Sequence, residues 1–141
     1  MNLRNFYNQK AQWVKKVKLF TLEVDDLAKS FRAGRHIGMG RLYELGYKTQ
    51  KLGVRGEQLR EAMDQVRPPI ARRERVHQGI AAVCQLLEVA SKVLVHVLEV
   101  QNTPQVSFPS YETDLYQTAA VDTAPLENFE ELRRRIEGEV D

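Results

Sequence analysis

Cysteine is almost absent from this chain of 141 residues, in which Cys84 stands alone. One cysteine excludes an intrachain disulfide, so the fold is not a disulfide scaffold. The apolar neighbours Val83, Leu86 and Leu87 predict that the Cys84 thiol is buried. A reducing, cytoplasmic environment suits this composition best.

Long apolar runs are also missing. The stretch 76–87 carries no charge, but it is well short of the roughly 20 residues that a transmembrane helix needs. Charged side chains interrupt the N-terminal region, where a signal peptide would have its apolar segment. We therefore expect neither a transmembrane segment nor a signal peptide in this sequence.

Motifs of catalysis and cofactor binding are absent as well. The glycine-rich stretch 33–40 is not followed by Gly-Lys-Ser/Thr, and no apolar strand precedes it, so it does not match a phosphate-binding loop. His36, His77 and His96 do not recur with Cys, Asp or Glu at the spacing of metal ligands. No serine elbow or catalytic cysteine context is present. The sequence thus predicts a non-catalytic protein with no metal, no cofactor and no small-molecule substrate.

Residues at heptad spacing, most of them apolar, are the dominant feature of the chain. Two interleaved series each advance by seven positions, so the local spacing alternates between three and four. The first contains Lys10, Val17, Val24, Phe31, Gly38, Leu45, Leu52, Leu59 and Val66; the second contains Phe6, Trp13, Phe20, Leu27 and Gly34, then Leu42, Thr49, Gly56, Met63 and Ile70. Such spacing predicts an all-α chain of long helices that form a helical bundle or coiled coil.

Two interruptions divide the pattern into helices. The second series slips by one residue between Gly34 and Leu42, among glycines that each weaken a helix by roughly 1 kcal/mol. Pro68 and Pro69 lack the backbone N–H and clash with the preceding turn, so they predict a sharp change of direction. The predicted helices span about 5–32, 41–66 and 70–101, within a bundle of residues 1–102.

Three further glycines, Gly46, Gly53 and Gly56, lie inside the second predicted helix, and the first two are seven residues apart. One interpretation is a small-residue face that lets a neighbouring backbone approach closely. The other is a marginal helix that relies on its partners for stability.

The third predicted helix is apolar around most of its circumference. Its seam is Val76, Ile80, Val83, Leu87, Ala90, Leu94 and Val97, and other faces carry Leu86, Val89, Val93, Val95, Leu98 and Val100. A helix of this kind must be covered on several sides. Either other chains cover it, which predicts an oligomer, or it is the central helix of a monomeric bundle; we favour the oligomer.

The composition changes after Asn102, where prolines predict an extended arm. This second region spans 103–141 and ends in a short helix at about 126–138. The arm carries more aromatic residues than solvated tails usually do, so it either docks on a neighbouring subunit or folds back over its own bundle. The residues predicted to bind a partner are Trp13, Phe20, Leu87, Leu94, Phe108, Tyr111 and Tyr116.

The charge is unevenly distributed along the chain. Residues 1–80 carry 17 Lys and Arg against 8 Asp and Glu, whereas residues 81–141 carry 4 against 11. Such asymmetry indicates either a basic surface for nucleic acid or anionic lipid, or attraction between the two halves or between subunits. The candidate nucleic-acid contacts cluster beside the double proline: Arg67, Arg72, Arg73 and Arg75.

These patterns together predict a structural or adaptor subunit that assembles through helix packing into a homo- or hetero-oligomer. Its expected partners are copies of itself or other helical proteins. The alternatives are a nucleic-acid-binding assembly factor that uses the basic half, and a protein that lies on a membrane surface through its basic amphipathic first helix.

Overall fold

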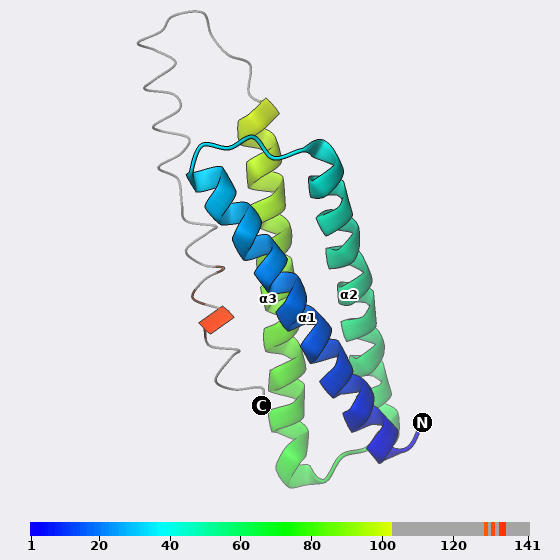
Figure 1. Cartoon of the computed structure of the whole chain (residues 1–141). Helices are drawn as coiled ribbons and strands as arrows, with labels where there is room; N and C mark the ends of the chain where they lie inside the picture. The colour runs from blue at the N-terminus through cyan, green and yellow to red at the C-terminus, as the bar shows by residue number, and fades with distance from the viewer. Residues whose placement is uncertain (103–128, 130, 132, 135–141) are drawn as a thin grey trace, which may run out of the picture.

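A computed structural model of the protein describes residues 1–102, 129, 131, 133 and 134. This part of the chain contains three helices and no strand: α1 (Leu3–Arg32), α2 (Met39–Val66) and α3 (Ile70–Asn102). The helices run up, down and up and pack side by side (Figure 1). The all-α prediction is therefore confirmed, and the helix ends lie within two residues of those expected from the sequence.

Both ends of α1 have a local cause in the sequence. At the start, the Asn2 side chain accepts a hydrogen bond from the Asn5 backbone N–H at 2.8 Å, which caps the first turn. At the end, Gly34 has a φ of 81°, a conformation that costs glycine little. The Arg35 N–H then returns to the Ser30 carbonyl at 3.0 Å. This is a Schellman cap, so the glycine stretch ends α1.

The double proline separates α2 from α3. Arg67, the residue before Pro68, has a φ of 47° and lies in the left-handed region at the C-cap of α2, where its N–H donates to the Met63 carbonyl at 3.1 Å. The first turn of α3 begins at Pro69, whose carbonyl accepts the Arg73 N–H at 2.9 Å. The chain reverses direction at this point, as Figure 1 shows.

A single apolar core fills the space between the helices. It includes Phe6, Trp13, Val17, Phe20, Val24 and Leu27 of α1, Leu42, Leu45, Leu59 and Met63 of α2, and Val76, Ile80, Val83, Leu86, Leu87, Ala90, Val93, Leu94 and Val97 of α3. Ile70 belongs to the predicted seam but is 85% exposed, because it begins α3 at the open end of the bundle.

The apolar residues of α3 outside its seam are mostly covered by the chain itself. Leu86 and Val93 are buried, and Val89 and Leu98 pack partly buried against the core. Val95 remains exposed. One chain thus covers most of the apolar surface of α3, so an argument for oligomerisation needs a different observation.

The length and composition of α3 are sufficient to cross a membrane. The charge-free stretch 76–87 is too short to indicate this, because the charged residues on either side of it belong to the same helix. The core helix of a globular bundle meets the same criteria, and the seam of α3 packs against α1 and α2. This property alone is weak support for a membrane span.

The loop between α1 and α2 is fixed to the end of α3. The Ile37 N–H donates to Oε1 of Gln101 at 2.6 Å, and Nε2 of Gln101 donates to the Ile37 carbonyl at 2.9 Å. Ile37 itself is buried. One side chain thus satisfies both backbone groups of a buried loop residue, which holds the three helices together at this end.

Candidate protein-interaction surface

All three helices meet at a junction formed by Trp13, Gly56 and Cys84. The Trp13 side chain is 2% exposed, and its Nε1–H donates to the Leu52 carbonyl at 2.9 Å. A Cβ atom on Gly56 would lie 2.7 Å from Cζ2 of Trp13 and 2.9 Å from Sγ of Cys84. The absence of a side chain at Gly56 is what lets α2 pack this closely against both neighbours.

The other two glycines of the pattern have no such role. An added Cβ on Gly46 or Gly53 would meet nothing within 4 Å. Close approach within the chain is therefore found at Gly56 and not at Gly46 and Gly53, the pair on which the repeated small-residue face was based.

The first surface groove runs between α1 and α2, and we call it the α1–α2 groove. Its lining includes Gln9, Trp13, Lys16, Leu19, Phe20 and Glu23 of α1 and Lys48, Lys51, Leu52, Val54 and Arg55 of α2. Its volume is about 550 Å³. The floor contains the buried rings of Trp13 and Phe20, and the rim combines apolar and cationic side chains.

The rim of this groove is predominantly positive. Lys48 lies 3.0 Å from a carboxylate oxygen of Glu23 and 3.6 Å from one of Glu44, and the hydrogen bond with Glu23 is the main cause that raises the pKa of Lys48. Lys51 lies 5.0 Å from the centre of the Tyr47 ring, a cation–π geometry. Glu23 is the one carboxylate in the lining, against four cations.

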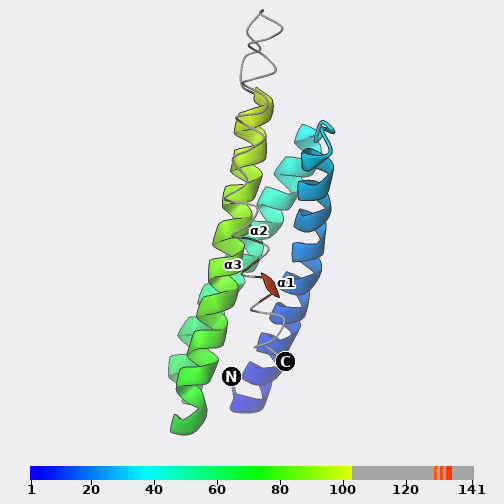
Figure 2. The same cartoon turned by 90° about the vertical axis from the view of Figure 1, so that its left-hand side faces the viewer.

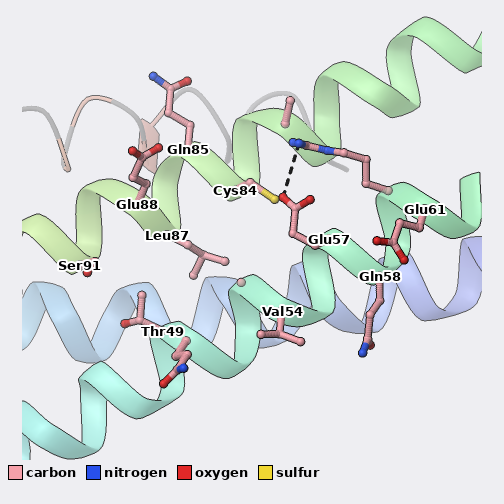
Figure 3. A pocket seen from close by; sticks show the side chains of 14 residues that line it. Thr49, Val54, Glu57, Gln58, Glu61, Cys84, Gln85, Leu87, Glu88 and Ser91 are labelled. Carbon is pink, nitrogen blue, oxygen red and sulfur yellow. Dashed lines mark ion pairs between the residues drawn. The ribbon is translucent and has the colours of Figure 1, made fainter.

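A second groove, of about 770 Å³, runs between α2 and α3. Figure 3 shows the Cys84 sulfur on its α3 wall, facing Glu57 of α2. Glu57 pairs with Arg60 at 3.4 Å. Burial raises the pKa of Cys84, and the charge of Arg60 opposes this shift only in part. The thiol therefore stays protonated at neutral pH, and nothing here activates it as a nucleophile.

No candidate metal site is found among the residues that the structure describes. Residues 1–102 with 129, 131, 133 and 134 contain no group of three or more His, Cys, Asp or Glu side chains arranged to hold an ion. His96 instead stacks edge-on with Phe31, at 6.2 Å between ring centres.

Of the residues predicted to bind a partner, Trp13 and Phe20 line the floor of the α1–α2 groove, and Leu87 lines the second groove. Trp13, Phe20, Leu87 and Leu94 are all buried in the core of the bundle, so they stabilise the fold of the single chain. Phe108, Tyr111 and Tyr116 lie outside the described residues, as does the predicted arm over 103–125.

Sequence reasoning missed a set of exposed apolar residues that we call the apolar stripe. It consists of Leu19, Leu22, Tyr43, Tyr47 and Val54, all on α1 and α2. Leu19 is 56% exposed and Val54 is 53% exposed. A signal was available in the sequence, because these residues also recur at spacings of three, four and seven. They lie off the heptad seam, however, so the heptad pattern does not indicate them.

The four arginines near the double proline are all exposed, at the end of the bundle where α2 and α3 join. Arg67 and Arg73 line a small pocket of about 270 Å³. Nearby on α1, burial lowers the pKa of Lys10, and the charge of Arg75 lowers it further. Asp64 lines the same pocket as Arg67 and Arg73, so the positive charge of the four arginines is partly offset at this end of the bundle.

A last set of contacts joins the C-terminal region to the bundle. Asp25 of α1 is buried and pairs with Lys29 at 3.1 Å and with Arg133 at 3.2 Å. Phe129 is 1% exposed and belongs to the core. The described residues of this region have helical backbone and lie beside α1 and α3, on the side away from α2 (Figure 2).

Asp25→Asn should loosen the attachment of this region, because it removes the charge that Arg133 faces in a buried site. We expect a loss of about 1 to 3 kcal/mol in the free energy of unfolding. Hydrogen exchange of peptides that contain Phe129 should accelerate. The control is Asp26→Asn, an exposed neighbour, which should change neither quantity. Equal exchange in both variants would show that the Asp25–Arg133 pair does not hold the segment.

Comparisons with known proteins assign no family to this chain. Searches against protein-family models, curated proteins and solved structures gave no match. Because a three-helix bundle supports many functions, the fold does not identify one either. The function must be argued from the surfaces described above.

Proposed function

We propose that this protein is a non-catalytic structural or adaptor subunit that assembles through helix packing into a homo- or hetero-oligomer. One observation carries the proposal: the apolar stripe remains exposed on α1 and α2 although the core is already filled without it. Two of its residues, Leu19 and Val54, line the same groove, and large apolar side chains exposed together on a surface are typical of protein-binding sites.

The composition of the stripe supports a protein partner. Tyr43 and Tyr47 supply large, rigid contact groups, and tyrosine is enriched in the energetically important centres of interfaces. Cations lie between the apolar residues in the sequence, Lys48 and Lys51 among them. They favour a partner surface that carries acidic groups. A segment of another subunit that carries apolar and acidic groups fits this combination.

The sequence supports three further details of the proposal: the mode of helix packing, a docking arm and the cellular setting. The heptad spacing supports packing of the coiled-coil type among the helices of the bundle. The aromatic residues between 103 and 125 support an arm that docks on a neighbour. The lone cysteine supports a reducing, cytoplasmic setting.

Sedimentation of the full-length protein tests the proposal. We expect the wild-type chain to form a discrete complex, insensitive to nuclease, with a mass above the 16.3 kDa of one chain. The double variant Leu22→Glu/Tyr47→Glu should dissociate it, because two charges would be buried without partners at the interface. Circular dichroism should show unchanged helix content, since both side chains are exposed in the single chain.

The matched control is Ile70→Glu/Val95→Glu. It replaces two exposed apolar residues of α3 with the same charges and should leave the mass unchanged. A wild-type chain that sediments alone at 16.3 kDa at micromolar concentration would contradict self-assembly through the stripe.

The exposed arginine cluster supports a second candidate function, a nucleic-acid-binding assembly factor. Arg67, Arg72, Arg73 and Arg75 lie exposed at one end of the bundle, which suits phosphate contacts. Such a protein would purify with a raised ratio of absorbance at the nucleic-acid maximum, and the ratio would fall in high salt. No comparable observation favours the membrane-surface alternative, because the apolar face of α1 is buried in the bundle.

A further inference from the structure

The α1–α2 groove combines two features that together specify the chemistry of an occupant. Leu19 and Val54 expose more than half of their surface at its rim, which calls for apolar or aromatic groups. Within residues 1–102 and the four described C-terminal positions, no carboxylate pairs with Lys16, Lys51 or Arg55. An acidic segment with aromatic side chains is complementary to both features.

This chain contains one such segment. Residues 103–128 include four acidic residues and no Lys or Arg. Within them, Tyr111, Glu112, Asp114, Leu115 and Tyr116 place carboxylates between large apolar groups. The stretch is also more than long enough to reach a neighbouring molecule, since an extended chain spans about 3.3 to 3.6 Å per residue.

We propose that residues 106–116 of a second copy of the chain bind in the α1–α2 groove. The aromatic side chains would cover Leu19 and Val54, and Glu112 and Asp114 would face Lys16 and Lys51. This inference rests on the proposed assembly function and adds to it the site and the segment that meet.

The positions of the two ends of this segment favour a second copy over the same chain. It follows Asn102, and its far end is held by the Arg133–Asp25 pair. Asp25 and Lys16 are nine residues apart in α1, which is roughly two and a half turns, so they lie on opposite sides of the helix. The segment of one chain is therefore anchored on the far side of α1 from its own groove.

Complementary charge reversal in the full-length protein tests the proposal. The groove variant is Lys16→Glu/Lys51→Glu, and the segment variant is Glu112→Lys/Asp114→Lys. Each variant alone should raise the dissociation constant for self-association by about tenfold or more, because attraction becomes repulsion at two sites. An equimolar mixture should restore the native mass, since the altered segment of one chain then matches the altered groove of the other.

The matched control is Lys15→Glu/Arg41→Glu, which changes the net charge equally at exposed positions outside the groove. It should leave the dissociation constant within about twofold of wild type. Far-UV circular dichroism verifies that all variants remain helical.

The outcomes separate this inference from the proposed function. If the wild type is oligomeric and both reversal variants keep its mass, the groove is not the docking site and the assembly function stands. If each variant dissociates but the mixture does not reassociate, the pairing of groove and segment is refuted. A monomeric wild type overturns this inference together with self-assembly.

Discussion

Replacing Trp13 with alanine is expected to lower the free energy of unfolding by about 3 to 5 kcal/mol, the range for removing a large aromatic side chain from a core. Trp13 is the largest of the fully buried side chains and lies where α1, α2 and α3 meet. Its loss leaves a cavity between three helices that are each anchored at their ends, so the bundle cannot close around it easily. Urea denaturation followed by circular dichroism measures the change.

Trp13→Phe separates the two contributions of the indole. It keeps much of the apolar volume but loses the Nε1–H that donates to the Leu52 carbonyl. We expect a smaller loss than in the alanine variant, since one hydrogen bond contributes about 1 kcal/mol and the cavity is smaller. If the phenylalanine variant is as unstable as the alanine variant, the hydrogen bond and not the packing dominates at this junction.

Gly56→Ala should destabilise the protein, which is the opposite of what the same change usually does in a helix. Alanine gains about 1 kcal/mol over glycine in a helix interior. At Gly56, however, the new Cβ would lie within 3 Å of both the Trp13 ring and the Cys84 sulfur. The overpacking costs about 1 to 3 kcal/mol, so the thermal midpoint should fall or, at the lower limit, stay unchanged.

Gly53→Ala is the matched control for this prediction. It lies in the same helix, and a Cβ there meets nothing within 4 Å. The thermal midpoint should rise, because only the gain in helix propensity remains. A similar rise in both variants would mean that the helices do not approach as closely at Gly56 as the structure shows.

Much of the fold followed from local chemistry. Spacings of three and four placed the three helices, since one face of a helix repeats every 3.6 residues. Gly34 and the double proline marked the breaks because glycine tolerates a positive φ and proline cannot donate a backbone hydrogen bond. These effects act within a few residues, so no tertiary information was needed to recognise them.

The candidate site was much less accessible to sequence reasoning. Trp13, Phe20, Leu87 and Leu94 are large and apolar, which predicts partner binding, yet all four are buried in the chain's own core. Size and periodicity do not distinguish a residue that packs against its own chain from one that packs against another. That distinction depends on which faces the neighbouring helices cover.

By itself, the sequence determined that residues 1–102 form three long helices, and it placed their ends to within two residues, because caps, breaks and apolar seams are local properties. Only the tertiary structure decided the rest. It showed that α3 is mostly covered within one chain, that Gly56 and not Gly46 or Gly53 is the point of close approach, and that Leu19 and Val54 remain on the surface. It also brought Arg133 to Asp25, two residues far apart in the sequence. The physical reason is the same in each case: burial and charge pairing are set by which helix faces meet, and that choice is made by packing in three dimensions.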